Sequence, residues 1–402
     1  MNIDFDFDTL TLDLGVGFIF DEVTLILLAI SFCCLFLLVT VYRHFITTVY
    51  RKSVKDNYTQ DEPIEETLPP VSVVVYATPD CQGLADTLNA ILEQDYPAEF
   101  DVTVVNDGQS DDVKDIVNLI HNTHKNLFIT FVPDDAHSLS RRKLSMTLGI
   151  KGARHDCVVF TNAGVQIESN RWLELMVRPY AAGKEVVIGY CALDHYSPLS
   201  SMQAFDRVAT SAAYLGSAIN GAPYRANNNN LVISKKTFFA NNGFSRSLNL
   251  HGGDDDIFIS EICNKHNTAV VLASEAILYF SPNNPGKFHR HDKKSHIFTG
   301  RRIFKSGNLM MSFGSWMRFI GLGSGIAAAI WGLPSLIPAI WVAITFVSTA
   351  TIMSVAWNKT ALAIGEQLGS FGIIFTAIFR PLYNFYYGIV SLRTSRQNYT
   401  WS

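Results

Sequence analysis

The stretch Val71–Asp112, VSVVVYATPDCQGLADTLNAILEQDYPAEFDVTVVNDGQSDD, decides the fold of this chain. Its first residues, Val71–Tyr76, are apolar and mostly β-branched, which predicts a strand buried on both faces of a parallel sheet. Apolar residues then recur at helical spacing. A second predicted strand, Val102–Val105, ends in the turn Asn106-Asp107-Gly108. Because ligands of open parallel sheets sit beyond the carboxyl ends of the strands, Asp107 is a candidate binding residue.

The alternation of strand and helix continues beyond this stretch. It predicts an α/β fold with a mostly parallel central sheet flanked by helices. The further predicted elements are a helix over Leu139–Ile150 and strands over Leu127–Val132, Cys157–Thr161, Val186–Tyr190 and Asn230–Ile233.

Long uncharged segments lie on both sides of this domain. A bilayer core takes about 20 apolar residues to cross, so we expect transmembrane helices over residues 23–42, 315–333 and 337–357. A buried core helix is the alternative for each. In residues 367–392, Arg380-Pro381 separates two apolar halves that are each too short to span. We expect an interfacial or re-entrant helix there, with a fourth span as the alternative.

Lysine and arginine placement predicts the orientation. Basic residues follow the first span and precede the second, so by the positive-inside rule the domain of residues 71–310 faces the cytoplasm. Residues 1–22 are then extracytoplasmic, and the polar residues 43–70 are expected to form a linker. The formal net charge of −4 argues against nucleic acid as a partner.

The block Pro70–Asp112 also carries a family resemblance. A strand ending near Tyr76 is followed by Gln94-Asp95-Tyr96-Pro97 and then by Val-Val-Asn-Asp-Gly-x-Ser-Asp. This combination resembles the membrane-bound family 2 glycosyltransferases of bacterial type, and the resemblance covers roughly Pro70–Lys305. It implies a GT-A nucleotide-sugar-binding domain in the bacterial inner membrane, working in polysaccharide biosynthesis of the cell envelope.

The resemblance also implies a donor site. In such enzymes the aspartate that matches Asp107 contacts the nucleotide, and Tyr76, Lys143 and Asn162 are further candidates for nucleotide-sugar binding. The alternatives are an ordinary turn aspartate at Asp107 and a solvated helix face at Lys143.

One motif departs from the family pattern. The family's fourth strand ends in Asp-x-Asp, which holds Mg²⁺ or Mn²⁺ against the diphosphate. Here Asn162 and Gly164 occupy the two acidic positions. We therefore expect metal binding to be weak or absent unless other carboxylates, such as Asp134 or Asp135, compensate.

The run His251-Gly252-Gly253-Asp254-Asp255-Asp256 resembles the acidic motif that supplies the catalytic base of inverting members. The resemblance implies that Asp254 takes the proton of the acceptor hydroxyl and that Asp256 orients it. An acidic helix start without catalytic function is the alternative.

Two regions are candidates for binding the acceptor or the diphosphate. Asn230 lies in a block that resembles the family's acceptor side, although local backbone capping explains asparagines equally well. The family's Gln-x-x-Arg-Trp motif is replaced by Asp292-Lys293-Lys294-Ser295-His296. Its basic residues can neutralise a diphosphate or face anionic lipid head groups. The candidates here are Arg290, Lys293, Lys294 and His296.

Two functions follow from these patterns. The first is an inverting glycosyltransferase that moves a sugar from a nucleotide-diphosphate donor of UDP type to a lipid-linked or growing glycan. The second is a weakened or inactive relative that serves as a scaffold subunit beside a partner synthase, as the lost motifs suggest. A transporter is disfavoured because the chain has too few predicted spans.

Overall fold

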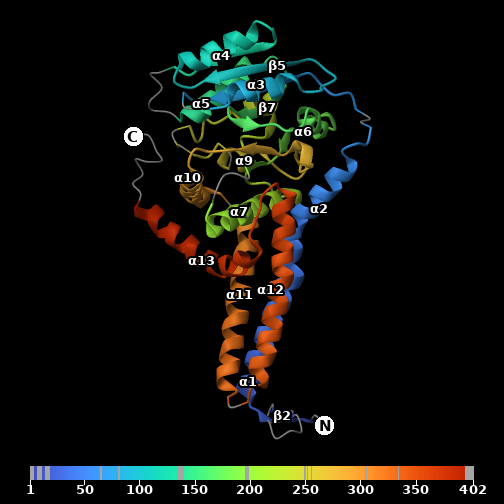
Figure 1. The fold of residues 1–402 in the computed structure, drawn as a ribbon, viewed down its shortest axis with the longest axis vertical. Helices are drawn as coiled ribbons and strands as arrows, with labels where there is room; N and C mark the ends of the chain where they lie inside the picture. Colours follow the sequence, from blue (N-terminus) through green and yellow to red (C-terminus); the bar gives the residue numbers. More distant parts are fainter. Residues whose placement is uncertain are drawn as a thin grey trace.

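The computed structural model describes residues 4–6, 11–13, 19–63, 66–79, 82–133, 140–194, 199–248, 250, 252–254, 256–303, 306–333 and 335–393. An α/β domain sits at one end of the molecule and a bundle of long helices at the other (Figure 1). Asp134 and Asp135, considered above as replacement metal ligands, lie outside the described residues.

A seven-stranded sheet forms the centre of the domain, in the order β12-β9-β11-β7-β4-β5-β6. Strands β7, β4, β5 and β6 run parallel, whereas β11 is antiparallel to both β7 and β9. The mostly parallel sheet predicted from the sequence is therefore confirmed. The strands are β4 (Val71–Ala77), β5 (Phe100–Asn106), β6 (Leu127–Phe131), β7 (Cys157–Asn162), β9 (Val186–Ile188), β11 (Leu231–Ser234) and β12 (Thr268–Val270).

Two smaller sheets accompany it. Strands β8 (Val165–Gln166), β13 (Leu278–Phe280) and β10 (Cys191–Leu193) pair at one side of the domain. Strands β1 (Asp4–Asp6), β2 (Thr11–Asp13) and β3 (Ile19–Phe20) form an antiparallel sheet at the end of the bundle far from the domain (Figure 1).

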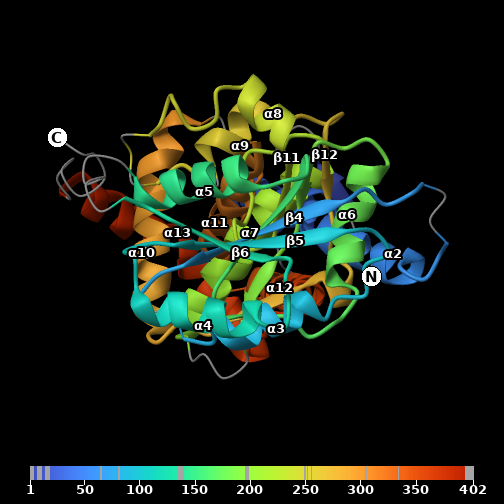
Figure 2. The ribbon, with the colours of Figure 1, turned by 90° about the horizontal axis from the view of Figure 1, so that it is seen from above.

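Helices cover both faces of the central sheet, with α3 and α4 on one side and α5 and α8 on the other (Figure 2). The strand side chains alternate accordingly. Val73 and Val75 belong to the same apolar cluster as Leu88 of α3, and Val74 to that of Ile150 of α5. The domain helices are α3 (Leu84–Leu92), α4 (Asp111–His121), α5 (Arg141–Gly152), α6 (Trp172–Ala181), α7 (Ser201–Ile219), α8 (Lys235–Ala240), α9 (Ile257–Ile262) and α10 (Pro285–Thr299), with the 3₁₀ turns η2 (Ser274–Ala276) and η3 (Gly300–Arg302).

The bundle contains long apolar helices. Four helical segments of the described chain are long and apolar enough to cross a membrane: Glu22–Thr59, Gly307–Trp331, Ile337–Ala363 and Gly372–Ser391. The elements are α1 (Glu22–Leu37), the π-helical turn η1 (Leu38–Tyr42), α2 (Arg43–Thr59), α11 (Ser306–Trp331), α12 (Ile337–Ala363) and α13 (Ser370–Arg393).

The first span differs from its sequence-based prediction. Residues 43–59, expected to belong to a linker, continue the helix of α1 without a break. The physical reason is that residues 43–62 contain neither glycine nor proline, and the first proline, Pro63, stands just after this stretch. The polar residues of this stretch are compatible with a helix, so the backbone remains helical as far as Thr59.

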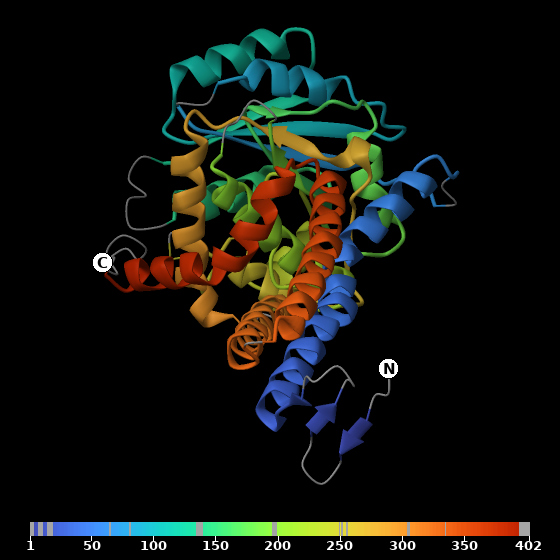
Figure 3. The same cartoon turned by 60° about the horizontal axis from the view of Figure 1, so that its bottom comes forward.

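Helix α13 has a different direction from α11 and α12. It turns away from the bundle along the underside of the domain (Figure 3). Arg380 and Pro381 lie inside this one helix, whose side chains also reach the domain. This course agrees with the expected interfacial helix, which stays a prediction because length and composition also allow a span.

Helix α7 joins the two parts of the molecule. Phe205, Val208 and Ala212 pack in an apolar cluster with residues of α2, α11 and α12. Tyr214 and Leu215 of the same helix pack in the core of the domain. The orientation of the domain on the bundle is thus fixed by a shared buried helix.

Candidate functional site

Two predicted donor residues meet at the carboxyl edge of the sheet. Tyr76 lies near the end of β4, and Asp107 follows β5 directly. The Tyr76 hydroxyl donates a hydrogen bond of 2.5 Å to Oδ2 of Asp107. Burial raises the pKa of the Tyr76 phenol above its usual range, so the phenol remains the proton donor at neutral pH.

Two arginines at the start of α5 extend this site. The Arg141 side chain donates from Nε to Oδ1 of Asp107 at 2.6 Å. The Arg142 guanidinium lies over the Tyr76 ring, 4.4 Å from its centroid, and donates from Nη1 to Oδ1 of Asn162 at 2.7 Å. Neither arginine was predicted as a site residue. The signal in the sequence is their position, since both begin the helix that precedes β7 on the binding edge.

The end of β7 offers little to a metal ion. The amide oxygen of Asn162 is occupied by Arg142, and its amide nitrogen donates to Asn229. Gly164 has a φ of +79°, and a Cβ there would lie 2.6 Å from the Gln82 carbonyl oxygen. Within the described residues, no group of three or more His, Cys, Asp or Glu side chains is placed to hold a metal ion. The described residues therefore do not fit the Mg²⁺ or Mn²⁺ site of the family.

The loop before β11 contains four consecutive asparagines whose side chains point to different places. Asn227 lines a cavity beside the bundle. Asn228 donates to Oδ2 of Asp254, and Asn229 accepts from Asn162. Asn230, the predicted ligand contact, is fully buried and bonds to Trp172 and to two backbone carbonyls. Asn228 and Asn229 reach the site, whereas Asn230 supports it from the core.

The acidic motif places one of its described carboxylates at the site and one in the core. The Asp254 side chain is 14% exposed and lies 3.7 Å from Nε of Arg142, which brings it to the donor edge. Asp256 is fully buried, accepts from the backbone N–H of Ile257 at the start of α9, and accepts from the Thr299 hydroxyl. Asp255 lies outside the described residues.

Lys143 binds the chain segment that leads into the acidic motif. Its side chain is fully buried, and its ammonium group donates to the backbone carbonyls of Ser247, Leu250 and Gly252. The ammonium group therefore faces protein carbonyls, and its contact with a nucleotide stays a prediction. A buried lysine that binds three carbonyls fixes the path of the chain toward Asp254.

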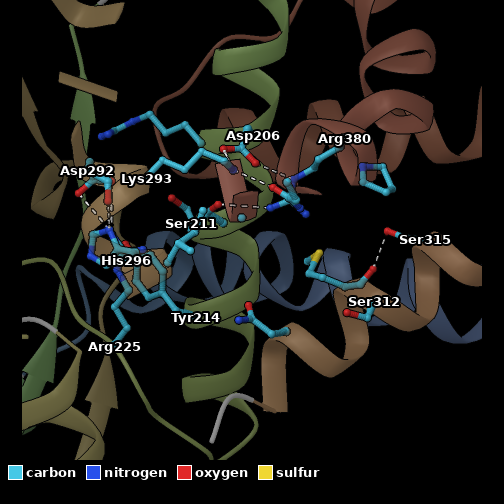
Figure 4. A pocket seen from close by; sticks show the side chains of 18 of the residues that line it. Asp206, Ser211, Tyr214, Arg225, Asp292, Lys293, His296, Ser312, Ser315 and Arg380 are labelled. Atoms are coloured by element: carbon cyan, nitrogen blue, oxygen red, sulfur yellow. Dashed lines mark hydrogen bonds and ion pairs between the residues drawn. The ribbon is translucent and has the colours of Figure 1, made fainter. Parts of the chain in front are cut away.

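A cavity of 520 Å³ lies between α7, α10, α11 and α13. Lys293 and His296 line it, as does Asp292, while Arg290 and Lys294 do not. In Figure 4, Lys293 and Arg380 converge on Asp206, and Asp292 lies beside His296. Helix α10 therefore connects the cavity with the acidic motif, because Thr299, on another part of the same helix, bonds to Asp256.

The charges around the cavity are largely paired. Asp206 of α7 accepts from Lys293 at 2.6 Å and from Arg380 at 2.9 Å, and His289 lies 3.3 Å away. Burial alone would raise the pKa of Asp206, but these three basic groups outweigh it and hold the pKa well below its usual range. Arg225 lies 3.6 Å from Asp292. No local pattern predicts Asp206, Arg225 and Arg380 as a group, since they are far apart in the chain.

Comparison with known proteins identifies the domain. Residues 72–210 match the model of glycosyl transferase family 2. This is a family 2 glycosyltransferase domain. The family predicted from the sequence is confirmed, and so is the GT-A fold. No curated protein matches the chain.

Solved glycosyltransferases align with this chain at low identity. The mannosyltransferase PcManGT from Pyrobaculum calidifontis, in complex with GDP-Man and Mn²⁺, is 15% identical, with a TM-score of 0.53 over 90% of this chain and 99% of that chain. TarS residues 1–349 from S. aureus, in complex with UDP-GlcNAc, are 13% identical, with a TM-score of 0.40 over 78% of this chain and 92% of that chain. The likeness to the mannosyltransferase concerns the fold alone.

Proposed function

We propose that this glycosyltransferase is an inverting enzyme of the cytoplasmic face of a membrane. It transfers a sugar from a nucleotide-diphosphate donor to a lipid-linked or growing glycan. The observation that carries the proposal is the contact network from Asp107 through Tyr76 and Arg142 to Asp254. It joins the predicted nucleotide contact and the predicted base at one edge of the sheet.

The proposed reaction uses Asp254 as the general base. Its carboxylate takes the proton of the acceptor hydroxyl while the hydroxyl oxygen attacks the anomeric carbon from the face opposite the diphosphate. The bond from this carbon to the diphosphate oxygen breaks, and its electron pair leaves with the nucleoside diphosphate. Partial exposure of Asp254 and its place beside Arg142 support this role.

The acceptor is proposed to approach through the cavity between the domain and the bundle. This cavity lies next to the apolar helices α11 and α13. Asn227 lines the cavity, and the side chain of the next residue, Asn228, bonds to Asp254. An acceptor with a lipid portion among the helices and a polar head in the cavity suits such surroundings. Lys293 and His296 are the proposed contacts of that head.

The donor class is proposed from chemistry and from the fold. The family resemblance favours a UDP-sugar, and the mannosyltransferase that shares the fold is described with GDP-Man. The basic residues that flank the first two spans support placing the domain in the cytoplasm, and the family resemblance supports the bacterial inner membrane.

A scaffold function is the second candidate. It is favoured by the neutral end of β7, where Asn162 and Gly164 replace carboxylates, and by the loss of the Gln and Arg of the motif on α10. In that case the chain would bind a partner synthase and Asp254 would have no catalytic task.

Nucleotide release separates the two candidates. Detergent-purified protein is incubated with UDP- and GDP-sugars, with Mn²⁺, Mg²⁺ or EDTA, beside the variant Asp254→Asn. For an enzyme we expect the variant to lose about 10²- to 10⁴-fold in rate while it elutes in size-exclusion chromatography as the wild type does. The matched control is Asp111→Asn, because Asp111 is an exposed aspartate on α4.

Equal release by the wild type and Asp254→Asn would contradict the assignment of the base. Absence of release from every donor, together with co-purification of another membrane transferase, would favour the scaffold.

A further inference from the structure

The backbone at the end of β7 excludes the second carboxylate of the metal motif. Gly164 adopts a left-handed conformation that side-chain-bearing residues rarely adopt, and the Gln82 carbonyl oxygen fills the space of a Cβ. An aspartate at this position would be strained and would clash with backbone. The second acidic position of the motif is thus excluded by the backbone conformation at Gly164, and changing the side chain alone would not restore it.

The guanidinium of Arg142 lies beside Asn162, the polar residue that remains at the end of β7. Nη1 of Arg142 binds the Asn162 side-chain oxygen, and the same guanidinium stacks on Tyr76. The described carboxylate of Asp254 is 3.7 Å from Nε of Arg142, which is longer than a hydrogen bond. Among the described residues, Arg142 therefore carries a positive charge that is held in position and only loosely paired with a carboxylate.

We propose that Arg142 binds the donor diphosphate in place of a divalent metal ion, so that donor binding needs no metal. This inference rests on the proposed function, since it assumes a nucleoside-diphosphate donor. A guanidinium is permanently charged, and its fork of N–H donors matches phosphate oxygens in pairs. The side chain is 20% exposed, which leaves it accessible to a ligand at the sheet edge.

The neighbouring arginine is less suited to this task. Arg141 is held by Asp107 through contacts of 2.5 Å and 2.6 Å, so its charge is already neutralised. Arg142 also lies between the proposed diphosphate site and the proposed base. When its guanidinium turns to the diphosphate, Arg142 withdraws its positive charge from Asp254, which keeps its bond from Asn228, and offsets the negative charge that develops on the leaving group.

Calorimetric titration of the purified full chain tests the inference without relying on turnover. UDP, GDP, UMP and GMP are titrated in EDTA, and again with Mn²⁺. We expect the wild type to bind a diphosphate equally well, within about twofold, in both conditions. Arg142→Gln should weaken diphosphate binding at least about tenfold and reduce the preference for diphosphate over monophosphate. Arg142→Lys should recover part of the loss.

The matched control is Arg154→Gln. Arg154 lies over Phe128 at the opposite end of the sheet, next to the start of β4, and its loss should not change nucleotide binding. Circular dichroism and size-exclusion chromatography verify that each variant is folded.

Three outcomes would overturn the inference. They are diphosphate binding that disappears in EDTA and returns with Mn²⁺, unchanged binding by Arg142→Gln, and no nucleotide binding in any condition. Only the last would also remove the donor class of the proposed function. Metal-free binding that depends on Arg142 but leads to no transfer would support the inference while contradicting the proposed reaction.

Discussion

The hydroxyl of Thr299 donates a hydrogen bond to the carboxylate of Asp256, which fastens the end of α10 to the acidic motif. Asp256 also caps the start of α9, so the start of α9 and the end of α10 share one buried carboxylate. Since α10 lines the cavity with Asp292, Lys293 and His296, this one contact joins the proposed acceptor path to the proposed base.

Thr299→Val tests this connection. Valine keeps the shape of the side chain but leaves an oxygen of a buried carboxylate without its donor, so we expect unfolding to cost about 1–3 kcal/mol less. We also expect kcat to fall about tenfold with little change in donor KM, because Asp256 is predicted to orient Asp254. Steady-state kinetics with varied donor measures the split. An increase in donor KM alone would contradict a positioning role.

Lys143→Met separates a supporting role of Lys143 from the predicted nucleotide contact. The substitution removes a buried ammonium together with its hydrogen bonds to the carbonyls of Ser247, Leu250 and Gly252, of which Ser247 keeps only its bond from the Leu250 backbone N–H. We expect a loss of several kcal/mol in unfolding free energy, measured as a lower Tm. Lys151→Met, at an exposed position of the same helix, is the control. A variant with the wild-type Tm and weaker nucleotide binding would support the predicted nucleotide contact and contradict the supporting role.

Asp206→Asn should destabilise the cavity wall. It leaves Lys293 and Arg380 without their buried carboxylate, which costs about 3–5 kcal/mol. The pKa of Asp206 is lowered in the folded state, so its contribution is fully present above the unfolded value of about 3.9 and is lost as pH falls further. The Tm difference between wild type and variant should therefore shrink only below about pH 4. A difference that vanishes already at pH 6 would contradict this pairing.

Asn162→Asp tests what a returned carboxylate does beside Arg142. We expect the new carboxylate to pair with the Arg142 guanidinium, because Arg142 already donates to the side chain at this position. The variant should then gain no tight Mn²⁺ binding in electron paramagnetic resonance titrations, and its UDP binding should weaken about tenfold as the arginine charge is neutralised. Micromolar Mn²⁺ binding by the single variant would show that Arg142 leaves the site readily.

The local patterns predicted the fold well. Strand Val71–Ala77 and strand Cys157–Asn162 lie within one residue of their predicted ends, because uninterrupted β-branched runs have few alternatives in a parallel sheet. The helical course of residues 43–59 was missed, since polarity was taken as a sign of a linker although no helix-breaking residue is present.

The site was predictable only in part. The positions of Tyr76, Asp107 and Asp254 follow from strand ends and from the start of α9, which local sequence signals. The partners Arg141 and Arg142 depend on how α5 packs against the sheet, and Asp206 meets Arg380 across a separation that no local pattern records. Hydrogen-bond partners likewise separate Asn228 and Asn229, which bond to Asp254 and Asn162, from Asn230, which bonds to Trp172 in the core, although the letters are identical.

The unbroken helix from Glu22 to Thr59 changes how the domain must meet its substrate. A flexible tether would let the catalytic edge search for acceptors at various depths. A continuous helix, packed against α7, instead fixes the distance of that edge from the proposed spans. For the proposed lipid-linked acceptor, the length between lipid anchor and reactive sugar then becomes a criterion of selection.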